Sequence, residues 1–205
     1  MDQKLTDRNQ LEELRARLDI LESKQAIVEL RFKYCRAVDR GDLDLLKSVF
    51  HADAVIDQDR AFAGNAHQFA EFILPLLTRS YPHRHAITNL LIELDGERAF
   101  CETQYASSHR VAVDSNTVFD VEAQGRYLDV VERRDGVWKI AYQRLFIEKT
   151  VTRRVSAFDL EGAALASPYP VDPVYLGFAT PSTRPADRRL AGGIFDRLIA
   201  RHGEV

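Results

Sequence analysis

The chain has 205 residues, of which 45% are hydrophobic and 29% charged, and its formal net charge is −3 at pH 7. This composition is typical of one globular domain with terminal extensions, and it offers no basic surface for a nucleic acid or an anionic membrane. No apolar run is long enough to cross a bilayer. The first ten residues are polar and do not form a signal peptide, so we expect a cytoplasmic protein with reduced thiols at Cys35 and Cys101.

The N-terminal residues 1–22 are predicted to form a helical extension. Leucines recur there at spacings of three, four and three residues, at Leu11, Leu14, Leu18 and Leu21, which predicts an amphipathic helix. The helix could pack on the domain or associate with a second subunit, and its heptad pattern is too short to define a coiled coil. We expect Ser23 to cap a second helix that starts the main domain.

The second helix leads to the stretch from Tyr34 to Asp42. Apolar residues continue at helical spacing to Val38, and Gly41 is expected to end the helix because glycine tolerates a left-handed conformation. Asp39 then lies near the helix C-terminus, where the macrodipole favours cations. Its carboxylate is either a solvated turn residue or needs a compensating partner. Tyr34 and Asp39 are about 140° apart on an ideal helix, so only a distorted last turn would bring both to one cavity.

The rest of the chain alternates turns with strands after two further helices. Asp42 is expected to cap a short helix, a first strand begins at 51–56, a turn follows at 62–64, and a helix covers 66–77. From residue 83 the period changes to two, which places His85 and Asn89 on one strand face. Long strands are expected over 99–113, 121–133 and 137–150, with turns at Asp95-Gly96, at residues 114–116 and at Asp135-Gly136. Helices followed by an antiparallel meander predict an α+β fold.

One face of the strand over 99–113 is small and mildly polar, as expected for a cavity wall rather than an apolar core. It carries Ala99, Cys101, Thr103, Tyr105, Ser107 and His109. Residues 151–205 differ again, because they hold five of the seven prolines. We expect this C-terminal extension to be loop-rich, to wrap over the domain or a neighbouring subunit, and to end in a short helix at Ile194, Phe195, Leu198 and Ile199.

Four segments of the chain resemble the SnoaL-like branch of the nuclear transport factor 2-like superfamily. They are the stretches at 26–42 and 50–54, the His85-Ala-Ile-Thr-Asn89 segment, and 125–144 with Gly125-Arg-Tyr127 and Trp138. The resemblance implies a cone-shaped domain over 23–150, in which N-terminal helices pack on a curved, mostly antiparallel mixed sheet that encloses a pocket. Dimers and trimers both occur in this superfamily, so we expect a homo-oligomer.

The resemblance also implies roles for particular residues. Asp39 and His85 fall on the Asp–His pair that lindane dehydrochlorinase and scytalone dehydratase use. Tyr34 and Arg144 fall on further residues of the bile-acid dehydratase set, although the additional carboxylate of that enzyme has no counterpart here. His109 resembles a second histidine of scytalone dehydratase, and Tyr127 an aromatic pocket residue.

These residues permit an elimination or isomerisation without a cofactor or a metal. His85 would act as the general base, Asp39 would orient it, and Tyr34 with Arg144 would polarise the substrate. We predict a hydrophobic small-molecule substrate, such as a steroid, a polyketide or an aromatic metabolite, contacted by His109, Tyr127, Tyr105, Asn89 and Ser107. Polyketide cyclisation, a non-catalytic binding or assembly module, and a metal held by His83 and His85 with a third ligand remain alternatives.

Overall fold

The computed structural model describes residues 2–58, 61–77, 82–114, 117–155, 167–172 and 174–175. Within these ranges, three helices and six strands follow one another. They are α1 (Asp2–Arg40), α2 (Leu43–Ser48), β1 (Phe50–Asp57), β2 (Ala63–Asn65), α3 (Ala66–Leu77), β3 (His83–Asp95), β4 (Arg98–Asp114), β5 (Thr117–Arg134) and β6 (Val137–Val155). The prediction of an α+β fold is therefore confirmed.

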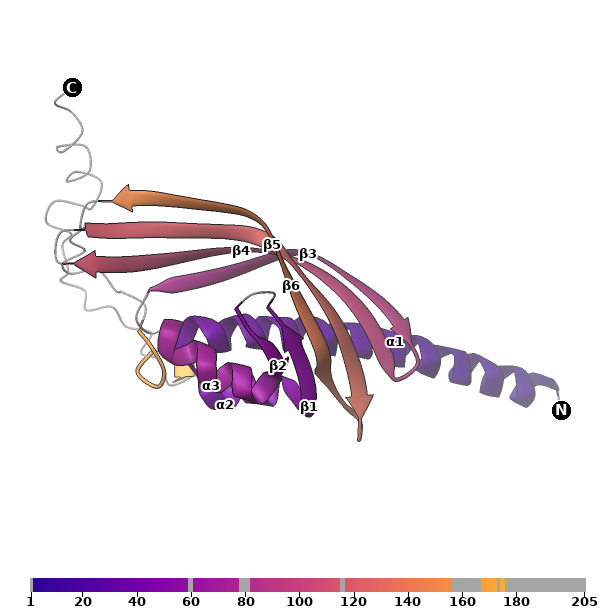
Figure 1. The fold of residues 1–205 in the computed structure, drawn as a ribbon. Helices are drawn as coiled ribbons and strands as arrows, with labels where there is room; N and C mark the ends of the chain where they lie inside the picture. Colours follow the sequence, from indigo (N-terminus) through magenta and orange to yellow (C-terminus); the bar gives the residue numbers. More distant parts are fainter. Residues whose placement is uncertain are drawn as a thin grey trace, which may run out of the picture.

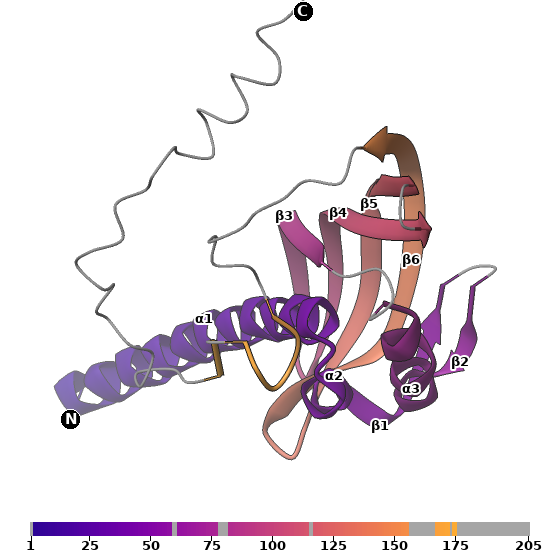
Figure 2. The ribbon, with the colours of Figure 1, turned by 90° about the vertical axis from the view of Figure 1, so that its left-hand side faces the viewer.

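The six strands form one curved sheet in the order β2-β1-β6-β5-β4-β3. Only β1 and β6 pair in parallel, and all other neighbours are antiparallel. The three helices lie on the concave side of the sheet, with α1 crossing beneath β3 to β6 and with α2 and α3 beside β1 (Figures 1 and 2). The buried apolar side chains gather between these helices and the sheet.

Helix α1 runs without a break through the boundary that we predicted between residues 22 and 23. Ser23 is buried and lies within hydrogen-bond distance of the Arg133 guanidinium, 3.5 Å away, so it does not cap a helix. The residues around it are good helix formers with no glycine or proline, and nothing in the sequence ends the helix there. The predicted end is confirmed, because Gly41 has a φ of 69° and Asp42 caps α2 by accepting from the Leu45 N–H.

Two other predicted boundaries differ from the structure. The turn that we predicted at 62–64 overlaps the short strand β2 (Ala63–Asn65), which pairs with the end of β1. Strand β6 continues to Val155, past the domain end predicted at 150, because it stays paired with β5 as far as Val118. No helix in the described parts of the chain is both long and apolar enough to span a membrane.

Irregularities in the strand pairing reverse which residues face the concave side. In β3 the register shifts between Thr88 and Leu90, and Asn89 adopts a φ of 23°. Between β5 and β6 the partner of Val131 is Ile140 but the partner of Val130 is Tyr142, so Ala141 is an extra residue. An extra residue in one strand is a β-bulge, and it switches the alternation of all residues beyond it.

A short part of the C-terminal extension packs against the end of α1. The carboxylate of Asp172 pairs with Arg40 at 3.1 Å, and the Tyr169 N–H donates to the Arg40 carbonyl at 2.6 Å. The rings of Tyr169 and Tyr175 pack edge to face beside this contact. These contacts agree with the expectation that the extension wraps over the domain, whereas the helix predicted at 194–199 lies outside the described residues.

Candidate active site

Asp39 and His85 are bonded across the interface between α1 and β3. The Nδ1 atom of His85 lies 2.7 Å from Oδ1 of Asp39, and the backbone N–H of His85 donates to Oδ2 at 3.0 Å. Both oxygens of the carboxylate are thus held by donors of one residue, which offsets its unfavourable position near the end of α1. Since a carboxylate only accepts, Nδ1 carries the proton of this bond, and in the neutral form of the ring Nε2 then holds the lone pair.

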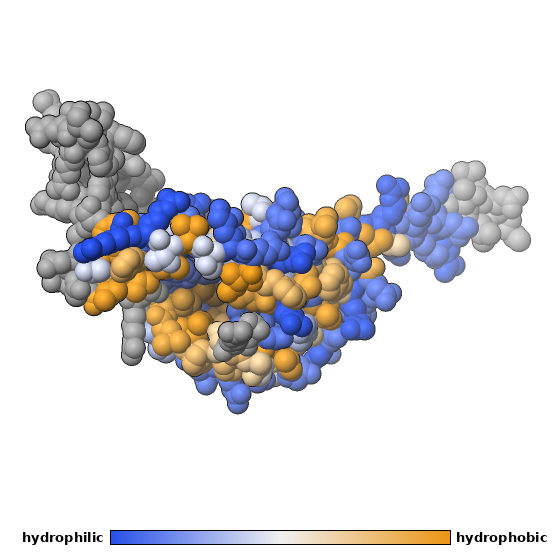
Figure 3. Space-filling model, turned by 45° about the horizontal axis from the view of Figure 1, so that its top comes forward, coloured by the Kyte–Doolittle hydropathy of each residue, from blue (hydrophilic) through white to orange (hydrophobic). Residues whose placement is uncertain are grey.

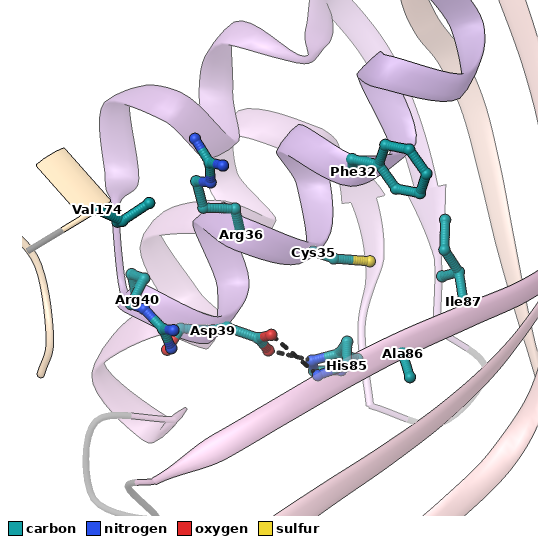
Figure 4. A pocket seen from close by; sticks show the side chains of 9 residues that line it. All are labelled: Phe32, Cys35, Arg36, Asp39, Arg40, His85, Ala86, Ile87 and Val174. Carbon is teal, nitrogen blue, oxygen red and sulfur yellow. Dashed lines mark hydrogen bonds and ion pairs between the residues drawn. The ribbon is translucent and has the colours of Figure 1, made fainter. Parts of the chain in front are cut away.

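A pocket of about 430 Å³ opens beside this pair, between α1 and the edge strand β3. Figure 4 shows the Asp39 carboxylate pointing at the His85 ring, while Phe32 and Ile87 stand on either side of the space next to it. The remaining walls are Cys35, Arg36, Arg40, Ala86 and Val174. Burial raises the pKa of the Cys35 thiol to about 11, so this side chain is a neutral wall and not a nucleophile. The pocket is therefore partly apolar, with cationic groups at its margin.

Two further histidines surround His85 on the concave face. The ring centroid of His109 lies 5.6 Å from the ring centroid of His85 and 5.7 Å from that of His83. His83 donates from Nε2 to the Val38 carbonyl at 2.6 Å. The pKa of His109 is lowered to about 4, mainly by burial and then by the neighbouring His85 and His83. Its ring is therefore neutral at neutral pH. Within the described residues, no group of three or more potential ligand side chains is arranged to hold a metal ion.

Three tyrosines extend this cluster along the concave face. Tyr105 lies 6.5 Å from His85 between ring centroids, Tyr127 lies 4.7 Å from Tyr105, and Tyr34 lies 5.7 Å from Tyr127. Tyr34 also packs against Phe50 and is 3% exposed, so it is a core residue that does not line the pocket. Burial raises the pKa of the Tyr105 hydroxyl, and this group is the phenol nearest to His85. The structure thus brings Tyr105 closer to the pair than Tyr34. The residues that line the pocket of about 430 Å³ include neither of these tyrosines, nor Tyr127, Ser107 or His109.

The two bulges place Arg144 and Asn89 away from the pair. Strict alternation along β6 would put Arg144 in phase with the buried Trp138, but the extra residue Ala141 turns Arg144 to the outer face, where it pairs with Asp57 at 3.4 Å. The Asn89 amide likewise donates to Gln104 on the exposed outer face instead of sharing the face of His85. Both predicted placements are wrong, because strict alternation does not survive a bulge. Ser107 is buried and lies directly opposite His85 in the β3–β4 pairing.

A buried ion pair that the sequence analysis missed lies deeper in the concave face. Arg31 contacts the Asp129 carboxylate, and Gln143 donates to the second oxygen of Asp129 at 3.1 Å. The Arg31 guanidinium contacts the rings of both Tyr34 and Tyr127, at 4.8 and 4.6 Å from their centroids. The signal in the sequence is that Arg31 and Asp129 occupy positions in the buried phase of α1 and β5.

A SnoaL-like domain model matches residues 19–144. The chain belongs to this family. The match covers α1 from residue 19 onward, all of α2 and α3, and the first part of β6. It therefore includes Asp39, His85 and the tyrosine cluster. The resemblance seen in the sequence is thereby confirmed at the level of the family. A comparison with curated protein sequences found no match.

Solved structures of the same fold include enzymes that carry out eliminations. A hexachlorocyclohexane dehydrochlorinase, LinA type 2, is 22% identical with a TM-score of 0.63, over 71% of this chain and 99% of its own. LinA type 3 from Novosphingobium barchaimii is 22% identical with a TM-score of 0.60, over 74% and 99%. A candidate scytalone dehydratase from Novosphingobium aromaticivorans is 22% identical with a TM-score of 0.58, over 71% and 97%. At this level of identity the similarity establishes the fold alone.

Proposed function

We propose that this SnoaL-like protein catalyses a cofactor-independent elimination or isomerisation of a largely apolar small molecule. The observation that carries the proposal is the hydrogen bond from His85 Nδ1–H to Asp39, which leaves Nε2 as a basic nitrogen beside a pocket of about 430 Å³. Among the described residues, Nε2 has no hydrogen-bond partner. The proposal is also supported by the names of the dehydrochlorinase and dehydratase neighbours.

In the elimination, Nε2 of His85 removes a proton from a carbon atom of the substrate. The C–H electron pair forms the new double bond while the leaving group departs with its own bonding pair. Asp39 keeps the ring in the productive tautomer and stabilises the imidazolium that forms. For a hydroxyl leaving group, the same imidazolium returns the proton and releases water. For an isomerisation it returns the proton to another carbon.

Polar groups around His85 would orient the substrate. Ser107 lies opposite His85, and the protonated hydroxyl of Tyr105 is available as a donor to a carbonyl or to the leaving oxygen. The neutral ring of His109 adds a polar contact without a charge that would repel the imidazolium. Tyr127 lies one ring farther away, behind Tyr105. We assign no role in the chemistry to Arg144 or Asn89, because both lie on the outer face.

The tautomer of His85 can be tested without a known substrate. Long-range proton–nitrogen NMR of the imidazoles is expected to detect His85 at neutral pH with its proton on Nδ1 and a bare Nε2. In the same spectrum of Asp39→Asn, His85 is expected to lose its preference for a proton on Nδ1, because the asparagine amide, unlike a carboxylate, does not require a donor. A proton on Nε2 in the wild-type protein would remove the basis for His85 as the base.

Turnover should then be measured on a panel of elimination substrates. Hexachlorocyclohexanes with chloride release as the readout, and β-hydroxy ketones with enone absorbance as the readout, cover the two leaving groups. We expect His85→Ala to abolish turnover of any substrate that the wild type accepts, and Arg144→Ala, as the matched control, to retain it. Equal losses in both variants would contradict the proposed site.

A non-catalytic binding or assembly module is the competing function, and one observation favours it. The side chains of His85 and Asp39 are only 9% and 13% exposed, as in a structural hydrogen bond. If the pair is structural, removing one partner leaves a buried group unsatisfied and costs about 1–3 kcal/mol of folding free energy. A large loss of stability in Asp39→Asn with unchanged ligand binding would favour this function.

A further inference from the structure

The solvent-facing side of α1 carries an apolar stripe that is much longer than its four leucines. Val28 and Phe32 continue the three-four spacing of Leu11, Leu14, Leu18 and Leu21, and Gln25 is its one polar position. We call these seven residues the α1 seam. They fill successive a and d positions of a heptad repeat, which is the pattern of a coiled-coil interface. The sequence alone did not give this length, because it placed a helix boundary at Ser23.

The seam faces away from the body of the protein. Its four leucines are 48–65% exposed and Phe32 is 55% exposed. The residues that bind α1 to the sheet are buried on the other side, at Ser23, Ile27, Leu30 and Tyr34. At 100° per residue the mean directions of these two sets differ by about 180°. A second helix could therefore lie along the seam without contacting the sheet of the subunit that carries the seam.

The N-terminal part of α1 also projects beyond the sheet. Asp19 is held by Arg133 at 2.6 Å, and Ala16 still lines the cleft beside the β3–β4 turn. The helix before Ala16 extends past the end of the sheet in Figures 1 and 2. On the side seen in Figure 3 this projecting part is mostly hydrophilic, whereas apolar side chains gather over the body. An exposed helix of this length with leucines along one side is marginal in water unless a partner covers it.

The charges beside the seam fit a second copy of the same helix in parallel orientation. In a parallel pair, each g position faces the e position five residues later on the other helix. Arg17 would then face Glu22, and Lys24 would face Glu29, each twice by symmetry. In the antiparallel register that pairs Leu18 with Leu21, Arg17 would instead face Lys24. In that antiparallel register Arg15 and Glu22 would attract, whereas the parallel arrangement has two attractive contacts and lacks the repulsion between Arg17 and Lys24.

We infer that the occupant of the α1 seam is a second copy of this chain, joined as a parallel two-stranded coiled coil. Gln25 lies at the single polar a position, where an Asn or a Lys specifies register and strand number in other coiled coils. Phe32, the last residue of the seam, also lines the pocket beside His85. The helix of the second copy would therefore run up to the edge of that pocket.

The first test is the mass of the full chain by analytical ultracentrifugation over a wide range of concentrations. We expect a reversible dimer of twice 23.3 kDa, and we expect Leu14→Glu with Leu18→Glu to give a monomer at every concentration. The matched control is Leu91→Glu, which changes a 67% exposed leucine on the outer face of the sheet and should leave the dimer intact. Circular dichroism checks that all variants fold. A wild-type monomer, or a dimer that only Leu91→Glu disrupts, would overturn the inference.

The second test addresses orientation. Arg17→Glu and Glu22→Arg should each weaken the dimer, and the double variant should restore it, because the swapped charges again face each other in a parallel pair. Leu11→Cys should form a covalent dimer on oxidation, since residue 11 meets its own copy only when the helices are parallel. A dimer that resists cross-linking at residue 11 and is not restored by the double variant would overturn the parallel arrangement.

Discussion

The Asp39 carboxylate receives two hydrogen bonds from the same residue, the His85 backbone N–H at 3.0 Å and the His85 Nδ1–H at 2.7 Å. The backbone bond fixes the end of α1 to the start of β3, and the ring bond fixes the imidazole on that strand. One carboxylate thus joins two elements of the fold and also sets the tautomer of the candidate base. Because the carboxylate has both roles, the effects of an Asp39 substitution on stability and on turnover should be measured separately.

We expect Asp39→Asn to lower turnover by about 10²–10⁴-fold, the range of a general base that loses its correct protonation and orientation. An asparagine side chain keeps the size of the carboxylate but no longer stabilises an imidazolium. The measurement is kcat on a substrate that the wild type converts, together with the thermal unfolding midpoint. A variant whose kcat stays within a few-fold of the wild-type value would show that the pair is not catalytic.

The Arg31–Asp129 pair is expected to dominate the polar energetics of the interior. Asp129→Asn leaves the buried guanidinium without its counter-charge and should cost about 3–5 kcal/mol in the free energy of unfolding. Urea denaturation measures this loss. Asp120→Asn is the matched control, because its pair with Arg110 is partly exposed and should contribute far less.

The combined change Arg31→Met with Asp129→Leu should recover most of the loss, since it removes both buried charges at once. If the double variant is as unstable as Asp129→Asn alone, then packing of Arg31 against the rings of Tyr34 and Tyr127, rather than the charge, is what stabilises this region.

Gly125 is expected to tolerate no side chain. A Cβ at this position would lie 1.9 Å from the Phe146 carbonyl oxygen, which belongs to the backbone of the paired strand and cannot rotate away. Gly125→Ala should therefore destabilise the fold by about 3 kcal/mol or more, at the upper end of overpacking effects. Gly96→Ala is the control, because a Cβ there meets nothing within 4 Å and only its φ of 58° is unfavourable for alanine. Similar midpoints of urea unfolding for the two variants would contradict this account.

The stability of the protein should fall as the pH drops from about 6.5 to about 4. His109 has a pKa of about 4 in the fold, below the ordinary histidine value of 6.5, so the unfolded chain binds more protons within this window. Stability therefore rises with pH through the window and is fully present above it. His83, whose pKa is also lowered by burial, acts in the same direction.

His109→Gln should reduce this dependence, because glutamine does not titrate. Urea midpoints recorded at a series of pH values, for the wild type and the variant, measure the change in slope. Identical slopes for the two proteins would mean that other groups cause the acid sensitivity.

The order and type of most elements could be predicted because they depend on local patterns. The end of α1 at Gly41, the cap at Asp42, the helix over 66–77 and the Asp-Gly turns all follow from the conformational preferences of a few neighbouring residues. The partnership of Asp39 and His85 was expected from the resemblance to the SnoaL-like family and from an unfavourable charge at a helix end. Its distance and its two-point geometry required the structure.

Tertiary structure decided the features that depend on pairing between distant segments. The bulges at Asn89 and Ala141 reverse the facing of Asn89 and Arg144, and a bulge arises from how two strands match in length and twist, which neither strand encodes alone. Burial of Arg31 likewise depends on Asp129, 98 residues away. By itself, the sequence determined the α+β class and the candidate pair. Packing decided which residues face the concave side of the sheet, that Arg144 points outward, and that the seam of α1 stays exposed. The reason is that only the assembled sheet defines which side of each element is covered.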